Sequence, residues 1–118
     1  MQIILPDSVD VQRYTGPGGY QVALTKVGID RQVDVFGFHD IVIPAGQFSK
    51  EHYHTKFIEL FYCLTAMRLK INDEMHFVPA GAMVVLQPGD RHEVYADEEV
   101  RFFAMKFPHV DGDKVVTS

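Results

Sequence analysis

The stretch 46-GQFSKEHYHTKFIELFYCLTA-66 places two histidines one residue apart and a glutamate shortly after them. Side chains at positions i and i+2 of a β-strand point to the same face, so the imidazoles of His52 and His54 can reach one ion. Glu59 follows the segment 55–58, which is long enough to turn the chain back. We therefore expect Glu59 to begin an antiparallel neighbouring strand and to bring its carboxylate beside the two imidazoles.

A second stretch, 81-GAMVVLQPGDRHEVYA-96, supplies His92, which would complete the site from a later strand. Three neutral imidazoles and one carboxylate leave a bound divalent ion with a net charge of about +1, which favours anionic small-molecule ligands. These nitrogen and oxygen donors suit divalent Fe, Mn, Ni, Cu or Zn without selecting among them. Four protein ligands leave two positions open on an octahedral metal, but they complete the shell of tetrahedral zinc.

Both stretches resemble the two sequence motifs of the cupins, the first over residues 46–66 and the second over residues 81–96. The positions in register are Gly46, His52, His54, Glu59, Gly81, Gly89 and His92. Three positions depart from the motifs, because Ala66 and Gln87 stand where the cupins have Gly and Pro, and Ala96 replaces Asn. The departures concern turns and strand ends rather than ligands, and alanine tolerates a positive φ poorly.

The resemblance implies an all-β fold with little or no helix, an antiparallel β-barrel or double-stranded β-helix of the jelly-roll type. It implies a single cupin domain over residues 1–118 and one divalent metal per chain, bound by His52, His54, Glu59 and His92. Cupins of this ligand set include non-haem iron dioxygenases, and we favour that activity slightly. A redox-neutral isomerase, epimerase or lyase of a sugar or keto acid is an alternative, as are a non-catalytic binding module and a polar cluster without metal.

The hydrophobic pattern of the whole chain agrees with a β-fold. Residues 33–38 and 67–71 alternate apolar with polar or small side chains, and no segment of useful length repeats at the helical period. Turn-forming residues separate the strand-like runs, at 16–19, 44–46, 72–73, 79–81 and 88–89. Short strands at such spacing predict a sandwich or a barrel.

Two predicted strands, 60–64 and 102–107, are apolar on both faces. A strand of a sheet with one solvated face would show a polar residue at every second position, so these strands must be covered on both sides. The barrel core covers one face. The other face is covered by a packed second layer or by a twin subunit, and we favour a homodimer because related cupins are often dimers.

Composition limits the partners and the compartment. A net charge of -5 without a basic cluster argues against nucleic acid and anionic membranes and leaves a small molecule as the expected partner. The single cysteine, Cys63, lies in an apolar run and is expected to be a buried thiol in the cytoplasm. The sequence shows no signal-peptide pattern and no apolar run near the roughly 20 residues of a membrane helix.

Two further residues are candidates for catalysis. His39 ends a predicted strand just ahead of the first motif, and it is the first residue to test as a general acid or base. Arg101 shares the face of Phe103 and Met105, so it either points toward the barrel mouth to bind a carboxylate or phosphate, or lies on the surface at a strand end. The surface position is favoured for Arg101.

Overall fold

A computed structural model describes residues 1–117, which form β-strands and loops without any helix. No helix of this described part is long and apolar enough to cross a membrane. The strands are β1 (Gln2–Ile4), β2 (Val11–Thr15), β3 (Gln21–Thr25), β4 (Gly37–Ile43), β5 (Phe48–Tyr53), β6 (Ile58–Cys63), β7 (Met67–Ile71), β8 (Glu74–Val78), β9 (Met83–Leu86), β10 (His92–Tyr95), β11 (Val100–Phe107) and β12 (Val115–Val116). The all-β prediction is confirmed.

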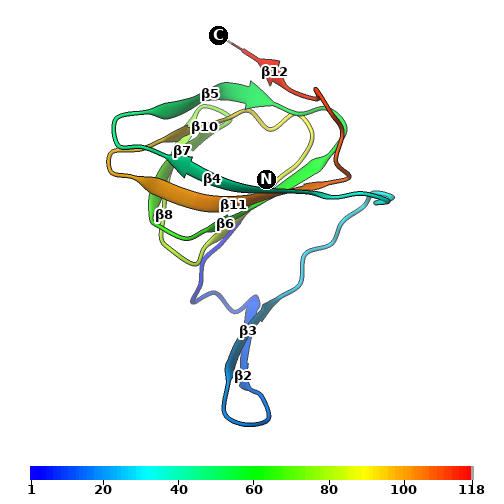
Figure 1. Ribbon diagram of the computed structural model, residues 1–118, viewed down its shortest axis with the longest axis vertical. Helices are drawn as coiled ribbons and strands as arrows, with labels where there is room; N and C mark the ends of the chain where they lie inside the picture. The colour runs from blue at the N-terminus through cyan, green and yellow to red at the C-terminus, as the bar shows by residue number, and fades with distance from the viewer. Residues whose placement is uncertain (118) are drawn as a thin grey trace.

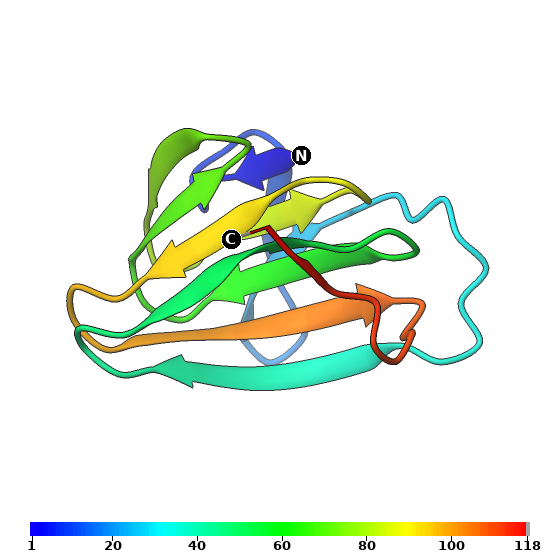
Figure 2. The same cartoon turned by 90° about the horizontal axis from the view of Figure 1, so that it is seen from above.

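The strands form two five-stranded sheets, which face each other in Figures 1 and 2. The strand order is β1-β9-β6-β11-β4 in the first sheet and β12-β5-β10-β7-β8 in the second. Neighbouring strands pair antiparallel throughout both sheets. The remaining pair, β2 and β3, forms a hairpin that projects from the barrel in Figure 1. The predicted antiparallel barrel architecture is therefore confirmed.

The barrel interior changes from apolar to ionisable along the strands of the first sheet. On β11 and β6 the inward-facing residues pair in the register Phe102 with Cys63, Ala104 with Phe61, and Lys106 with Glu59. The neighbouring strand β4 adds His39, which pairs with Ala104. The apolar half holds a continuous core of both sheets, in which Leu69 and Val84 are fully buried. The ionisable inward-facing side chains of β4, β6 and β11 thus lie toward one end of the barrel.

The turns follow the predicted residues. Asn72 and Asp73 connect β7 to β8 with φ angles of 49° and 70°, as a tight hairpin turn requires. The motif glycines Gly46 and Gly89 also have positive φ, 82° and 90°. Ala66, which replaces a motif glycine, is not among the described residues with positive φ, so this departure introduces no backbone strain.

The strand predicted at 33–38 is wrong over its first half, because β4 begins only at Gly37. The alternating apolar residues of 33–36 do not pair with a sheet. Instead, the Phe36 ring stacks on Phe107 with centroids 5.7 Å apart, so this segment packs across the outside of β11. The alternation of apolar and polar residues over 33–36 therefore reflects packing against β11 and does not indicate a strand.

The outer face of the first sheet is covered in part by the chain itself. Leu60 and Val85 face away from the barrel interior and are buried, because Val27 and Ile29 from the segment before β4 pack against them. Over this area, the segment with Val27 and Ile29 is the second layer that covers the outer face of β6. A twin subunit is not needed there to explain why this strand is apolar on both faces. Tyr62, on the same face, remains 36% exposed.

Candidate metal centre

Three histidines converge at the ionisable end of the barrel. His52 is an inward-facing residue of β5, His54 lies just beyond the end of β5, and His92 begins β10. The antiparallel pairing of the two strands places His92 opposite His52. All three side chains are buried, and one ring nitrogen of each lies within 4.8 Å of the others. This arrangement can hold one metal ion.

Glu59 reaches the same cluster from the opposite sheet. Its Oε1 lies 3.2 Å from Nε2 of His54 and 3.2 Å from Nε2 of His92. The expectation that Glu59 begins a strand next to β5 is wrong, because β6 pairs with β9 and β11 while β5 pairs with β10 and β12. Residues 54–57 cross between the sheets, so the carboxylate faces the imidazoles across the barrel interior.

The donor atoms at the centre of this cluster lack hydrogen-bond partners. Nε2 of His54, Nε2 of His92 and Oε1 of Glu59 are all buried, and within residues 1–117 none makes a hydrogen bond of acceptable geometry. Buried polar groups are normally paired, so unpaired lone pairs that converge on one point need an explanation. A bound cation satisfies all of them, and the donor set therefore fits a divalent metal.

The other ring nitrogen of each histidine is fixed by the backbone. An imidazole that donates from Nδ1 to a carbonyl keeps its Nε2 lone pair free for a metal, which is the usual second contact of a liganding histidine. The three Nδ1-to-oxygen distances are 2.7 Å for His52 to Lys50, 2.5 Å for His54 to Asp113 and 2.9 Å for His92 to Asp90.

The segment near Asp113 supports the site from the other end of the chain. The Asp113 carboxylate accepts hydrogen bonds from the backbone N–H of Thr55 at 3.0 Å and of Lys56 at 2.8 Å, and from the Thr55 hydroxyl at 2.6 Å. Strand β12 continues by pairing with β5. The sequence analysis missed this contribution, and no local signal could reveal it because Asp113 and Thr55 are 58 residues apart.

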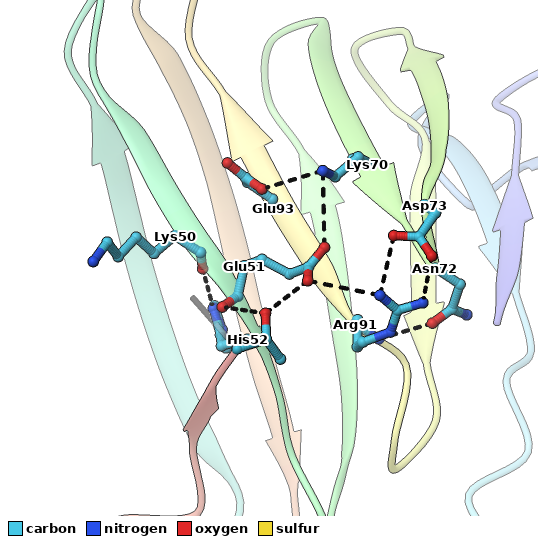
Figure 3. A network of polar contacts seen from close by, with 9 residues as sticks. Lys50, Glu51, His52, Lys70, Asn72, Asp73, Arg91 and Glu93 are labelled. Carbon is cyan, nitrogen blue, oxygen red and sulfur yellow. Dashed lines mark hydrogen bonds and ion pairs between the residues drawn. The ribbon is translucent and has the colours of Figure 1, made fainter.

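A network of charged side chains from the second sheet and its adjoining loops lies beside His52 (Figure 3). Glu51 pairs with Arg91 at 3.7 Å and with Lys70 at 3.9 Å, and Lys70 also pairs with Glu93 at 3.6 Å. Glu51 precedes His52 and Arg91 precedes His92, so this network ties together the chain segments that carry two of the candidate ligands. None of these charged residues lines the cavity.

The protonation states suit metal binding. Burial lowers the pKa of His52 to about 4, and the charges of His92 and Lys114 act in the same direction. Burial alone would raise the pKa of Glu59, but its contacts with His54 and His92 prevail and lower that pKa to about 2. His52 is therefore neutral and Glu59 ionised near neutral pH, which are the forms that ligate metals.

The cluster opens into a cavity of about 250 Å³. Besides the four predicted ligands, the lining includes His39, Lys106 and Lys114. The candidate His39 therefore lies at the site. The two lysines were missed, although Lys106 shares strand parity with the inward-facing Phe102, and this spacing could have indicated it.

Arg101 lies outside this cavity. Its side chain is 50% exposed and pairs with Asp40 at 2.9 Å. Both residues face outward on paired strands, so the surface alternative for Arg101 describes its position and the barrel-mouth alternative does not. The physical reason is strand parity, because Phe102 and Ala104 take the inward positions of β11.

Comparison with known proteins finds one curated sequence relative and many solved structures. No protein-family profile matches the chain. An L-ectoine synthase from Wolinella succinogenes is 29% identical over 83 residues, which make up 68% of this chain. The matched region spans only 63% of the length of that protein.

The solved structures agree on the fold. A DMSP lyase from Ruegeria pomeroyi matches 92% of this chain and 52% of its own, with a TM-score of 0.63 and 17% identity. A cupin protein from Bacteroides fragilis matches 73% of this chain and 81% of its own (TM-score 0.59, 18% identity). A salicylate 1,2-dioxygenase from Pseudoaminobacter salicylatoxidans matches 82% of this chain and 25% of its own (TM-score 0.59, 15% identity). The chain has the cupin fold.

Replacing His54 by Ala should abolish stoichiometric metal binding while the fold remains, because one of the converging Nε2 donors is lost. Elemental analysis after loading with zinc and desalting measures the metal, and circular dichroism checks the fold. His76→Ala, outside the cluster, serves as the control and should keep wild-type metal content. Unchanged metal in the His54 variant would remove His54 from the ligand set.

Titration of His39 followed by NMR in the zinc-loaded protein should give a pKa below the ordinary value of 6.5. Burial lowers the pKa of His39 most and the charge of Lys106 lowers it further, while Glu59 opposes them and His109 adds to the lowering. Lys106→Met should therefore raise the pKa of His39. A wild-type midpoint at or above 6.5 would contradict the placement of His39 beside the cationic end of the cavity.

Proposed function

We propose that this cupin-fold protein binds one divalent metal through His52, His54, Glu59 and His92 and catalyses a redox-neutral isomerase- or lyase-type reaction of a small molecule. The observation that carries the proposal is the position of His39, an ionisable group in the same cavity as the four donors. Isomerase or lyase chemistry requires proton transfer to or from the substrate, and an ionisable side chain apart from the metal ligands can carry it out.

The donor set supports a catalytic rather than a purely structural metal. Three imidazoles and one carboxylate suit Fe, Mn, Ni, Cu or Zn, and an octahedral ion among these keeps two positions for water or substrate. Such an ion supplies Lewis-acid polarisation of a carbonyl or hydroxyl group. The cavity of about 250 Å³ beside the donors gives a small substrate access to that position.

His39 acts in this proposal as the general acid or base. Its imidazole faces the cavity from β4, and burial together with the charge of Lys106 lowers its pKa. The ring is therefore mainly neutral at pH 7 and has a free nitrogen lone pair that can accept a proton from a substrate carbon or hydroxyl. The resulting imidazolium can return the proton to another atom of the same substrate.

The matching proteins include examples of redox-neutral chemistry, but they do not select a substrate. The names of matching proteins include a synthase, a lyase and a dioxygenase, so the cupin fold itself does not decide between redox-neutral and oxidative chemistry. The L-ectoine synthase and the DMSP lyase favour the redox-neutral alternative. Since the chain spans 63% of the L-ectoine synthase, we do not assign that protein's substrate to it.

A non-haem iron dioxygenase is the second candidate. The donor set, three histidines and one glutamate, would leave two coordination positions on an octahedral iron, enough for a substrate and dioxygen together. The structural likeness to a salicylate 1,2-dioxygenase agrees with this chemistry. In that case His39 would bind or orient the substrate and would not need to move a proton.

Turnover of small organic acids by the metal-loaded protein should proceed without oxygen. Proton NMR of an anaerobic substrate panel detects product, and an oxygen electrode should record no uptake. His39→Gln should lower kcat by about 100-fold or more if His39 transfers the proton, with metal content unchanged, while His76→Gln should behave as wild type. Turnover that strictly consumes oxygen would instead establish the dioxygenase.

We also propose that the protein is a homodimer, joined through the part of the first sheet that its own chain leaves uncovered. Phe38 is 53% exposed, Val42 49% and Tyr62 36%, and the Phe38 ring packs against Phe103 at 5.0 Å. These residues lie on the outer face of β4, β11 and β6, where the ion pair of Asp40 and Arg101 lies between Phe38 and Val42. A patch of this kind is typical of an interface between subunits.

Light scattering at micromolar concentration should give twice the mass of one chain, because burial of this face favours association. Phe38→Glu should give a monomer, since a buried carboxylate without a partner is unfavourable. Phe77→Glu is the matched control, because Phe77 is 77% exposed on β8 of the other sheet. A wild-type monomer, or a dimer that survives Phe38→Glu, would contradict the proposed interface.

A reducing compartment, the cytoplasm, is the proposed location. The only cysteine, Cys63, is fully buried as a free thiol. Burial raises its pKa to about 12, so the thiol stays protonated and unreactive. The stability of the barrel therefore depends on no disulfide.

A further inference from the structure

We infer that the substrate is a small organic carboxylate with an apolar body, whose carboxylate is held by Lys106 and Lys114 at the mouth of the cavity. The inference rests on the proposed function, because it names the substrate class of that same site. It assigns to the two lysines the role of specificity-determining residues. Both are separate from the metal ligands and from His39.

The position of Lys106 is fixed by the strand and by an aromatic ring. Lys106 is partly buried, shares the inward face of β11 with Ala104, and lies opposite Glu59 in the register of β6. Its Nζ lies 5.1 Å from the centre of the Phe57 ring, which in turn stacks on His54 with centroids 4.3 Å apart. The ammonium group is thereby held beside the metal centre instead of extending into solvent.

Lys114 approaches the same cavity from the chain segment after Asp113. It follows the residue whose carbonyl accepts the His54 Nδ1 hydrogen bond, and it precedes β12, which pairs with β5. The Lys114 side chain is exposed at the rim of the cavity. Lys106, on β11, and Lys114, in the segment before β12, therefore line one cavity.

Neither lysine has an acidic partner in the described part of the chain. The ion pairs that lysines and arginines form within residues 1–117 use Lys70, Arg68, Arg91 and Arg101 but neither cavity lysine. With neutral imidazoles, the cavity holds two ammonium groups and the single carboxylate of Glu59, although the whole chain carries -5. A positive cavity in an acidic protein concentrates anions and repels cations.

Most of the remaining cavity lining is apolar. It is formed by aliphatic and aromatic side chains of both sheets, Ile41, Ile43, Phe48, Phe61, Val94 and Phe102. A ligand that fills the space therefore has an apolar portion facing this wall and an anionic group facing the lysines. The volume of about 250 Å³ restricts it to a small metabolite.

A carboxylate fits this lining better than a phosphate ester does. Phosphate groups are commonly held by the fork of an arginine or by the N-terminus of a helix. The described lining contains no arginine, and the described chain has no helix. Two ammonium groups on flexible stems provide point charges, which are sufficient for a single carboxylate.

Benzoate and its neutral isostere benzamide test the inference by calorimetric titration of the zinc-loaded protein. Benzoate should bind about tenfold more tightly than benzamide, as expected of a charge-assisted contact. Lys106→Met should weaken benzoate binding by about tenfold, and Lys114→Met by about threefold because Lys114 is more exposed to solvent. Neither substitution should change the affinity for benzamide beyond about twofold, since the apolar wall is intact.

Three controls separate the possible outcomes. Lys106→Arg keeps the charge and should retain benzoate affinity within about threefold, which also guards against misfolding as the cause of any loss. Lys26→Met removes an equal charge at an exposed site outside the cavity and should have no effect. Zinc should remain stoichiometric in every variant, because no ligand is altered.

Equal affinity of the wild-type protein for benzoate and benzamide would overturn the inference, as would wild-type benzoate binding by Lys106→Met. Failure of the wild-type protein to retain zinc would instead overturn the proposed function. The two failures are distinguishable, because metal content and ligand preference are measured separately. Affinity that falls only in the two cavity-lysine variants supports the assignment.

Discussion

The antiparallel register of β5 and β10 is the constraint on which the site depends, because it sets His52 opposite His92. Side chains alternate between the faces of a strand, so a shift of one residue would turn one of the two imidazoles to the outside. Glu51 and Arg91, which precede these two histidines in the chain, form an ion pair on the outer face. A hydrogen bond of 2.8 Å from the Gly89 N–H to the His54 carbonyl fixes the adjoining loops.

Two halves of one barrel perform opposite tasks. The apolar half, which includes the fully buried Leu69 and Ala104, stabilises the fold by removing hydrocarbon from water. The ionisable half buries polar groups, which is unfavourable unless each finds a partner. Backbone carbonyls satisfy one nitrogen of every histidine in the cluster, and the remaining donors point at one another. The fold thus tolerates a destabilising centre that a cation would stabilise.

Charge is distributed unevenly between the surface and the cavity. The chain as a whole is acidic, with a net charge of -5, whereas Lys106 and Lys114 line the opening beside the histidines. The low dielectric of the apolar wall strengthens the field that these lysines produce inside the cavity. Burial, and after it the charge of Lys106, keeps the pKa of His39 below its ordinary value. Lys106 therefore contributes both to the proposed attraction of an anionic substrate and to the lowered pKa of the candidate base.

The sequence by itself determined the local features. These are the alternation of side chains along β5, the turn at Asn72 and Asp73, and the donors that the motifs supply. These follow from strand periodicity and turn chemistry, which act over a few residues. Only the tertiary structure decided that Glu59 faces the histidines from the opposite sheet and that Asp113 anchors the loop after His54. Such contacts join residues far apart in the chain, and they exist only once both sheets have packed around one interior.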